Sequence, residues 1–418
     1  MPIKLKVART AKELDDVFRL RYDVYVSERN KFSEKRATCD GRIVDHFDAL
    51  PGVANVVAYD GDTAIASFRV NKDSPFGLAP EKYFDFTEVR ADLAVCSEGL
   101  ASVPCVVSCS MLAIRKRWRR KRNVILALFK TVTAVMHGLG ATHVFGASSA
   151  ETFSIYRRLG CEAIAPEQWV ESVGDKLIPL MGPFDKIFTW AFGQNALKAK
   201  YFWLDNYCAQ FETILLSPGE VLFRENDRAE RVYSIERGGV TLSRKGPDQK
   251  DLVIAELGQG ALFGELAIFD DEQRSTTATA AMNTQMITIE RSHLLDIIHN
   301  EPWKADQLLE HFAHRLRKTD HLALVQQFAP QTSRVSYALE QLWNSAKIEV
   351  GRSPTRILQM DAEPIARQIA RRAQVRESEV RRVLEMRRVS GGLDYSDSVV
   401  RFFRSPSSEG VMSVNTSH

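Results

Sequence analysis

Residues 263–269 of the chain read FGELAIF, and residues 274–280 read RSTTATA. A cyclic phosphate carries one negative charge, so a pocket for it needs backbone N–H donors, a guanidinium and a hydroxyl, and the adjoining ribose needs an acceptor. Gly264 permits close backbone approach and a positive φ, Glu265 can accept from a ribose hydroxyl, and Arg274 can bond phosphate oxygens. The segment therefore predicts a cyclic nucleotide site; the alternative is a turn between strands with a solvated Glu and Arg.

The flanking sequence favours the nucleotide site. Short alternating runs separated by glycine turns recur at near-regular spacing, as a small antiparallel β-roll requires, at residues 218–220, 232–235, 238–242 and 257–260. From Phe211 to about Gln327 the chain resembles the cyclic nucleotide-binding domain of catabolite-activator-type bacterial regulators. That resemblance implies cAMP or cGMP as the effector. It implies a contact set of Gly264, Glu265, Leu266, Ala267, Arg274, Ser275, Thr276, Thr319 and Asp320.

The whole-chain composition sets limits on partners and compartment. The chain has 418 residues, enough for two to four domains, and a net charge of +3, so any nucleic-acid affinity must come from local patches. Its six cysteines form no metal-type CxxC pair, so we expect free thiols, a reducing compartment and no metal. The N-terminus lacks an apolar signal core, and the most apolar run, residues 124–139, is interrupted by Lys130 and His137. We expect a cytoplasmic protein without a membrane span.

Residues 1–193 alternate between helical and strand patterns. Residues 12–29 have helical periodicity, and two strands flank Asp60-Gly61-Asp62, a hairpin signal. A strand over 105–114, a helix over 123–138, a strand over 143–147 and a helix over 151–159 complete an α+β layout. This order resembles the GNAT acetyltransferase-like fold. The resemblance is strongest to the branch that contains N-acyl amino acid synthases and N-acyl homoserine lactone synthases.

Four charged residues match that branch and mark a candidate catalytic cleft. They are Arg21 in the first helix, Asp45 and Asp48 in an Asp-x-Phe-Asp segment, and Arg69 in a Ser-Phe-Arg-Val strand. The resemblance implies that they shape the side of the cleft where the acceptor amine binds. The alternative for each is a buried structural ion pair.

The turn before the central helix departs from the resembled fold. That fold usually binds the pyrophosphate of the acyl donor with a glycine-rich turn, whereas residues 114–124 read IRKRWRRKRNV and contain no glycine. Arg119 can occupy the usual basic position, and with Lys121 and Arg122 it forms the candidate acyl-donor site. The basic block suits the arm of an acidic acyl carrier protein better than coenzyme A. A solvated charged turn and a nucleic-acid contact are the alternatives.

No nucleophile is evident in the N-terminal region. Direct attack of an amine on a thioester needs a base and oxyanion donors rather than a Ser or Cys. Cys105 and Cys109 lie four residues apart on an expected strand, which is more typical of a core than of a catalytic pair. Whether this region is an active acyltransferase or a sensor stays open.

The C-terminal region keeps the apolar frame of a helix-turn-helix over residues 368–384 and a candidate wing at 392–403. It resembles the winged helix of the same regulator class. Two positions depart: Gln374 stands where a glycine turn is usual, and Arg376 stands where a Ser or Thr N-cap is usual. Arg376, Arg381 and Arg382 could still contact guanine edges or phosphates, while a vestigial dimerisation module is the alternative.

We therefore expect a multidomain α+β protein. It comprises a GNAT-like mixed sheet with helices over 1–193, an antiparallel β-roll with a long dimerisation helix over 194–328, a degenerate winged helix over 329–404, and a disordered tail over 405–418. Two functions compete. The first is a homodimeric, cyclic nucleotide-responsive transcription regulator with an acyltransferase-like domain. The second is a cyclic nucleotide-gated N-acyltransferase that uses acyl carrier protein or acyl-CoA and has a vestigial DNA-binding tail.

Overall fold

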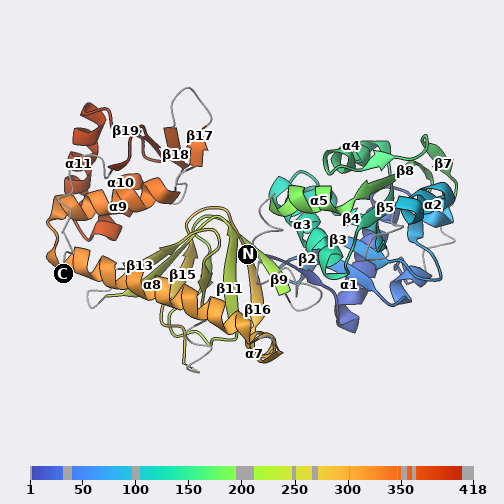
Figure 1. Cartoon of the computed structure of the whole chain (residues 1–418), viewed down its shortest axis with the longest axis horizontal. Helices are drawn as coiled ribbons and strands as arrows, with labels where there is room; N and C mark the ends of the chain where they lie inside the picture. The colour runs from blue at the N-terminus through green and yellow to red at the C-terminus, as the bar shows by residue number, and fades with distance from the viewer. Residues whose placement is uncertain are drawn as a thin grey trace. The chain divides into compact units, whose positions relative to one another are not determined.

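The computed structural model describes residues 2–31, 40–96, 104–193, 211–246, 251–265, 272–300, 302–345, 347–349, 355–359 and 364–406. The chain divides into two compact units, Met1–Leu215 and Leu216–His418. Both units contain helices and strands (Figure 1), so the multidomain α+β class is confirmed. The finer domain limits stay predictions, and most of the tail predicted to be disordered lies outside the described residues.

The N-terminal unit is built on one mixed sheet. Its strands run in the order β9-β1-β2-β3-β4-β5-β8-β6, with β7 paired to β8, and only β4 and β5 are parallel neighbours. The strands are β1 (Ile3–Val7), β2 (Val53–Asp60), β3 (Thr63–Lys72), β4 (Val106–Ile114), β5 (His143–Ser148), β6 (Glu162–Ala163), β7 (Gln168–Val170), β8 (Asp175–Pro183) and β9 (Phe211–Leu216). The helices are α1 (Ala11–Tyr22), α2 (Thr87–Cys96), α3 (Arg122–Gly138), α4 (Ala150–Arg158) and α5 (Phe184–Phe192), with a π-helical segment over Asp23–Ser27 and short 3-10 turns at His46–Ala49, Ala79–Lys82 and Lys116–Trp118.

Helices cover both faces of this sheet. Val57 packs in one cluster with residues of α1, whereas Phe68 makes an edge contact with Phe129 of α3. Val57 and Phe68 lie on opposite faces, because Phe68 is opposite Val56 in the β2–β3 register and successive side chains alternate. This explains why β2 and β3 are buried along almost their whole length.

The first helix begins with a capping box. The Thr10 hydroxyl accepts from the backbone N–H of Glu13, and the Glu13 carboxylate accepts from the backbone N–H of Thr10, so two donors at the helix start are satisfied. The α-helix ends at Tyr22 and continues as the π-helical segment Asp23–Ser27, where the sequence predicted an α-helix to Arg29. This wider turn includes Tyr25, which lines the cleft described below.

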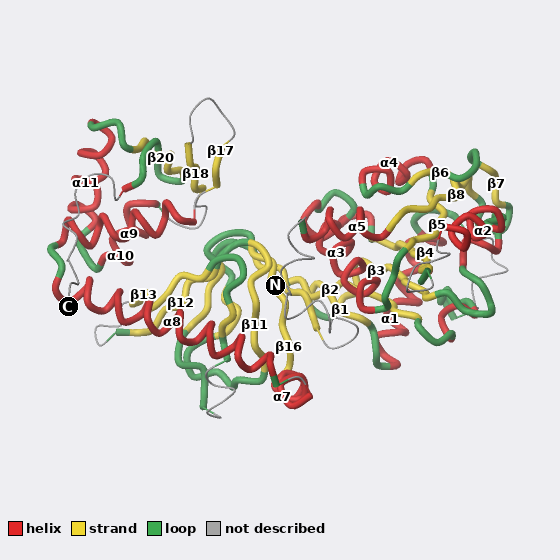
Figure 2. The backbone as a smooth tube through the Cα atoms, viewed as in Figure 1, coloured by secondary structure: helices red, strands yellow, loops and turns green. Residues whose placement is uncertain are grey.

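The second unit contains a β-roll and a C-terminal helical module. Its β-roll strands form two groups, β14-β11-β16 and β10-β15-β12-β13 (Figure 2). These strands are β10 (Val221–Phe223), β11 (Arg231–Arg237), β12 (Val240–Lys245), β13 (Asp251–Leu257), β14 (Leu262–Phe263), β15 (Thr277–Ala280) and β16 (Thr284–Glu290). The helices α7 (Arg291–Asn300) and α8 (Trp303–Phe328) follow, and α8 is the long helix that the sequence predicted.

The C-terminal module packs three helices with a small sheet. Its elements are α9 (Gln331–Ser345), β17 (Lys347–Glu349), β18 (Thr355–Gln359), α10 (Ile365–Ala373), α11 (Glu377–Val389), β19 (Leu393–Tyr395) and β20 (Val399–Phe402). The strands pair in the order β17-β18-β20-β19. The core includes Val335, Ile369, Val380, Leu384 and Phe402, so α9, α10, α11 and β20 share one hydrophobic cluster. The helix α9 ends at Ser345, and Ile348 lies in β17.

Candidate functional site

The four charged residues predicted for the acceptor cleft form one buried network. Arg21 and Arg69 are both fully buried. Arg21 Nη1 donates to both carboxylate oxygens of Asp48, at 3.0 and 2.9 Å. Arg69 donates to both oxygens of Asp45, at 2.5 and 3.1 Å, and its Nη1 also lies 3.0 Å from Asp48 Oδ2. Two guanidinium groups and two carboxylates thus balance one another in charge.

Two neutral residues that the sequence did not single out complete the network. Asn55 on β2 accepts from Arg21 Nη2 at 2.5 Å and donates to Asp48 Oδ1 at 3.3 Å. Ser110 on β4 accepts from Arg69 Nε at 3.1 Å. The signal for Asn55 was present in the sequence, since it is a single amide within the apolar run VANVVAY and a buried amide needs polar partners.

The two arginines keep the carboxylate of Asp48 ionised. Burial alone would raise the pKa of Asp48, but the positive charges of Arg21 and Arg69 outweigh it and hold the pKa of Asp48 below its usual value. Burial disfavours the charged form of Arg69, yet its bonds to Asp45 and Asp48 raise the pKa of its guanidinium. Asp45 is the more exposed carboxylate and lines the cleft beside Arg69.

The cleft lies where two parallel strands separate. The β4–β5 register runs from Val106 opposite His143 to Cys109 opposite Gly146, and no further pairs join the two strands. Met111, two residues beyond Cys109, has φ +56°, and the β3–β4 register shifts before Arg69. Such a bulge turns the strand away from its neighbour. Backbone groups of both strands therefore face the cleft, which is also lined by Tyr25, Arg69, Ser110, Ser148 and Tyr156.

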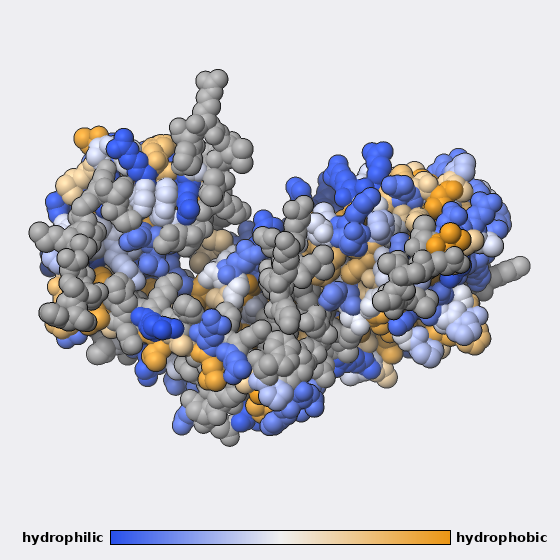
Figure 3. Space-filling view, viewed as in Figure 1, coloured by the Kyte–Doolittle hydropathy of each residue, from blue (hydrophilic) through white to orange (hydrophobic). Residues whose placement is uncertain are grey.

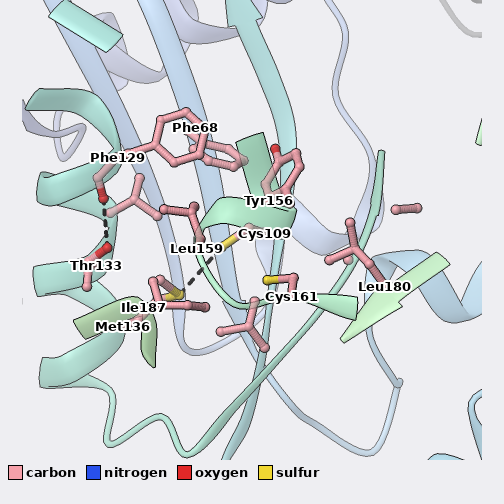
Figure 4. A pocket seen from close by; sticks show the side chains of 14 residues that line it. Phe68, Cys109, Phe129, Thr133, Met136, Tyr156, Leu159, Cys161, Leu180 and Ile187 are labelled. Atoms are coloured by element: carbon pink, nitrogen blue, oxygen red, sulfur yellow. Dashed lines mark hydrogen bonds between the residues drawn. The ribbon is translucent and has the colours of Figure 1, made fainter. Parts of the chain in front are cut away.

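An apolar pocket adjoins the polar cleft (Figure 4). The two share Phe68, Cys109, Ala147 and Tyr156. The pocket has a cavity volume of about 30 Å³ and is otherwise lined by Phe129, Val132, Thr133, Met136, Val144, Gly146, Leu159, Cys161, Leu180 and Ile187. In Figure 4 the Phe68 and Phe129 rings lie at one side of the pocket and Cys109, Met136 and Cys161 at another.

The phenols and the thiols that line this region all stay protonated at neutral pH. Burial raises the pKa of Tyr156 well above its usual value, and it raises the pKa of Tyr25 to about 12, so both phenols stay protonated at neutral pH. The Tyr25 hydroxyl donates to the Leu112 carbonyl at 2.8 Å. Burial also raises the pKa of Cys161 to about 11 and the pKa of Cys109 further, so neither thiol forms a thiolate readily. Cys105, Cys109 and Cys161 are free thiols in the described chain.

The basic turn is partly committed to contacts within the N-terminal unit. Arg119 donates to the Ile114 carbonyl at 2.9 Å and pairs with Glu28, whose carboxylate also accepts from the backbone N–H of Lys116. Lys121 and Arg122 are exposed at the start of α3. Of the three predicted donor-binding residues, Lys121 and Arg122 thus face solvent, and Arg119 holds the turn in place.

The candidate nucleotide cradle brings Gly264, Glu265 and Arg274 together. Gly264 has φ +77°, and a Cβ placed there would lie 2.8 Å from Arg274 Nη1, so both the backbone and the space require glycine. Glu265 is fully buried and Arg274 is 4% exposed. Ser275 is exposed and Thr276 half-buried. Leu266 and Ala267 lie outside the described residues, as do the side chains of Thr319 and Asp320 on α8.

Arg274 is held by carbonyls and aromatic rings. Its Nη1 donates to Gly264 O at 2.5 Å and its Nη2 to Arg231 O at 2.6 Å. The guanidinium carbon lies 4.4 Å from the ring centroid of Phe223 and 5.6 Å from that of Tyr233. Burial lowers the pKa of Arg274 despite the opposing effects of Tyr233 and Glu265. An anion at this position would restore the balance.

The C-terminal helix pair has the turn that the sequence implied. Gln374 ends α10 in the left-handed conformation, with φ 52° and ψ 49°. Arg376 is the N-cap of α11 and makes no side-chain capping bond. Arg381 pairs with Glu377 at 2.6 Å. The guanidinium of Arg382 bonds Glu379, also at 2.6 Å. Of the three exposed arginines predicted to bind DNA, Arg381 and Arg382 are therefore paired with acids of their own helix.

The chain thus has two candidate sites, a polar cleft in the N-terminal unit and a cradle around Arg274 in the β-roll. Residues 16–182 match the family model of N-acyl amino acid synthase FeeM, and residues 213–301 match that of the cyclic nucleotide-binding domain. Both resemblances seen in the sequence are thereby confirmed. No group of three His, Cys, Asp or Glu side chains in the described chain is arranged to hold a metal, and none of its helices has the length and apolar character of a membrane span.

Individual relatives match part of the chain. The CRP-like cAMP-activated global transcriptional regulator of Mycobacterium tuberculosis is 31% identical over 133 residues, which are 32% of this chain and 59% of the relative. The cyclic AMP receptor protein of Thermus thermophilus is 31% identical over 139 residues, 33% of this chain and 64% of the relative. The chain thus spans about three fifths of the length of these relatives.

Solved structures also align with part of the chain. FixK2 from Bradyrhizobium japonicum covers 47% of this chain and 93% of its own, with 20% identity and a TM-score of 0.41. FeeM, an N-acyl amino acid synthase from uncultured soil microbes, covers 44% of this chain and 93% of its own, with 14% identity and a TM-score of 0.35.

Proposed function

We propose that the chain is an N-acyltransferase gated by a cyclic nucleotide, which moves an acyl group from a thioester to an amine. The observation that carries this proposal is the polar cleft at the β4–β5 separation and its shared wall with the apolar pocket. A thioester needs both environments, because its carbonyl reacts among polar groups while its alkyl chain is buried among apolar ones. The match to N-acyl amino acid synthase FeeM over residues 16–182 supports the same chemistry.

The residues of the cleft have distinct roles in this reaction. Asp45, the carboxylate that lines the cleft, holds the ammonium of the acceptor, and Arg69 fixes Asp45 by its two hydrogen bonds. After the ammonium loses a proton to solvent, the amine nitrogen attacks the thioester carbonyl, loses its second proton to solvent as the amide forms, and the C–S bond breaks; solvent then returns a proton to the tyrosine that protonates the leaving thiolate. Tyr156, protonated and shared by cleft and pocket, donates a proton to the departing thiolate. Cys109 forms no acyl intermediate because its thiol stays protonated.

The experiment is a product assay by mass spectrometry. Full-length protein is incubated with a long-chain acyl carrier protein thioester and a mixture of amino acids, with and without cAMP or cGMP. We expect N-acyl products whose rate changes when nucleotide is added, and Tyr156→Phe should lower kcat about 10²-fold or more with little change in KM. No product under any of these conditions contradicts the proposal.

The acyl donor is proposed to be a carrier protein rather than coenzyme A. The exposed Lys121 and Arg122 offer charge to an acidic partner, whereas Arg119 is already bonded to Glu28 and Ile114. Charge reversal at Lys121 and Arg122 should lower kcat/KM for the carrier-protein donor about tenfold or more, and the wild-type rate should fall with salt. Equal turnover with acyl-CoA, or insensitivity to salt, argues against this donor.

A DNA-binding regulator is the second candidate function. The observation in its favour is the α10–turn–α11 unit followed by the paired strands β19 and β20, the order of elements in a winged helix. Exposed hydrophobic side chains along α8 support a homodimer formed through that helix. They are 56% to 72% exposed and belong to Leu309, Leu316, Leu324 and Phe328. Orange, hydrophobic side chains show at intervals along α8 in Figure 3.

A DNA-binding titration distinguishes the two candidate functions. If α11 reads DNA, a genomic site is bound more tightly than random duplex, the affinity falls steeply with salt, and Arg382→Ala reduces discrimination by about 1–3 kcal/mol. Equal binding of genomic and random duplex, with and without cyclic nucleotide, removes the regulator.

A further inference from the structure

The first strand of the cyclic nucleotide-binding segment is part of the N-terminal sheet. β9 pairs antiparallel with β1, with Leu5 opposite Thr213 and Ile3 opposite Leu215. The match to the cyclic nucleotide-binding domain begins at residue 213, yet residues 211–215 belong to the N-terminal unit. One strand therefore belongs both to the matched cyclic nucleotide-binding segment and to the N-terminal sheet.

Side chains fix β9 to the N-terminal unit. The Thr213 hydroxyl lies 3.3 Å from the Thr131 hydroxyl of α3, and both residues are buried. Lys6 Nζ lies 3.0 Å from Glu212 Oε1 and 2.9 Å from Glu13 Oε1. Burial alone would lower the pKa of Lys6, but its bonds to the two carboxylates raise it, so the ammonium stays charged. We call Glu212, Lys6 and Glu13 the β9 clamp.

The β9 clamp is connected to the acceptor network both through the helix α1 and through the strand β1. Glu13 belongs to the capping box of α1, and the last turn of α1 carries Arg21. β1 also pairs with β2, and the Ala8 N–H donates to the Asn55 carbonyl at 2.7 Å. Asn55 accepts from Arg21 at 2.5 Å. A shift of β9 therefore reaches Arg21 through both the helix and the neighbouring strand.

The C-terminal end of β9 is followed in the chain by a turn and by β10, which contacts the nucleotide cradle. A tight turn follows Leu216, in which the Ser217 N–H donates to the Glu220 carboxylate at 2.8 Å. β10 comes next, and its last residue, Phe223, supports the Arg274 guanidinium at 4.4 Å. Phe223, whose ring lies against the Arg274 guanidinium, is thus seven positions after Leu216, the last residue of β9.

We infer that β9 transmits occupancy of the cyclic nucleotide cradle to the acceptor network. A phosphate competes with the carbonyls of Gly264 and Arg231 for the donors of Arg274, and a changed Arg274 position changes its stacking on Phe223. The displacement passes through the turn into β9, and the β9 clamp carries it to Arg21. This inference rests on the proposed function. By linkage, an acceptor that binds the cleft would change nucleotide affinity by the same factor.

Hydrogen exchange of the full-length protein tests the coupling without an activity assay. Calorimetry first establishes saturation with cAMP, or with cGMP if cAMP does not bind. We then expect the exchange rates of β1 amides and of the first turn of α1 to change by about threefold or more on saturation. Unchanged β1 exchange in protein that calorimetry shows to be saturated overturns the inference and leaves the nucleotide site intact. No heat with either nucleotide removes the gated function itself.

Two variants test whether the β9 clamp carries the nucleotide-dependent change to α1. Lys6→Met removes the ammonium, and Lys4→Met is the matched control, because Lys4 lies on the same strand and is exposed. We expect the nucleotide-dependent change at α1 to fall by at least about half in Lys6→Met and to persist in Lys4→Met. If Lys6→Met fails to fold, Thr213→Val removes the hydroxyl contact to Thr131 with little change in shape. Full retention of the change in the folded variant overturns the route.

Discussion

Two buried arginine sites in this chain are balanced in different ways. In the N-terminal unit, Arg21 and Arg69 bond the carboxylates of Asp48 and Asp45, so the site is neutral as it stands. In the β-roll, Arg274 donates to two main-chain carbonyls and aromatic rings flank it. Tyr233, Glu265 and Asp227 also favour its charged form, but burial outweighs them and lowers its pKa.

This difference separates a site that is organised for structure and positioning from one that is organised to receive an anion. Carboxylates already bond both guanidinium groups of the first site, so we assign that network to orienting Asp45 at the cleft. A phosphate at the second site would add a negative charge beside Arg274, whose charged form is disfavoured by burial. Substitutions in the Arg21–Arg69 network should therefore lower the stability of the protein, whereas substitution of Arg274 should lower its affinity for the nucleotide.

The largest expected effect is at Asp48. Asp48→Asn leaves Arg21 and Arg69 buried with one carboxylate between them, which should destabilise the protein by about 3–5 kcal/mol. Urea unfolding, followed by near-UV circular dichroism, measures it. The control is Asp15→Asn, which removes the partly exposed pairs with Arg19 and Arg42 and should cost under about 1 kcal/mol. Similar losses in both variants would show that the buried network is not special.

The next effect is at Arg274. Arg274→Leu should weaken cAMP or cGMP binding by about 2–5 kcal/mol, because the bound phosphate would be left in a buried site without its charged partner. Unfolding in the absence of nucleotide should change much less than in Asp48→Asn. Isothermal calorimetry measures the affinity, with the 88% exposed Arg228→Leu as control. Equal affinity in wild type and Arg274→Leu would refute the cradle.

A weaker effect is expected at a carboxylate that is bonded but only partly buried. Although burial acts to raise it, the pKa of Glu13 is lowered to about 2 by the N–H groups of Arg9 and Thr10 and by Lys6. Because the folded pKa lies below the unfolded one, this contribution is present above about pH 4.5 and is lost as pH falls toward 2. Glu13→Gln should cost on the order of 1 kcal/mol at pH 7. That difference should shrink in unfolding curves taken at pH 4 and pH 3; a constant difference would contradict the linkage.

Local patterns made part of the fold predictable. The hairpin of β2 and β3 follows from Asp60-Gly61-Asp62, and Gly61 has φ +59° in the turn. The helix α3 follows from its apolar periodicity, and the structure has it over Arg122–Gly138. By contrast, β8 was not foreseen, because Pro179, Gly182 and Pro183 interrupt its strand pattern and its pairing with β5 is decided by tertiary contacts.

Some features of the candidate sites were likewise predictable from the sequence and others were not. Arg21 and Asp48 could be picked out through the resemblance to N-acyl amino acid synthases, and Arg274 through its spacing from Gly264 and Glu265 in the cradle motif. The partner of Arg119 could not be read, since Glu28 lies 91 residues away in the sequence. The same holds for the separation of β4 from β5, which depends on where hydrogen bonding between two strands stops.

The smallest expected effect concerns backbone conformation rather than charge. Gly264 in the cradle and Gln374 between α10 and α11 both have a positive φ, yet only the cradle uses glycine. Gln374 is exposed in the left-handed conformation, which is strained for a residue with a Cβ. Gln374→Gly should therefore stabilise the C-terminal module by about 0.5–1 kcal/mol, reduced in part by the greater freedom of glycine in the unfolded chain.

The matched change is Gly264→Ala, which meets the same backbone strain and would also place a Cβ 2.8 Å from Arg274 Nη1. It should destabilise the β-roll and reduce nucleotide affinity, whereas Gln374→Gly should leave nucleotide affinity unchanged. Thermal unfolding and calorimetry on both variants separate the two effects. A destabilised Gln374→Gly would show that the glutamine side chain or the stiffness of its backbone contributes more than the strain that glycine relieves, and that this turn is not a glycine site that has been lost.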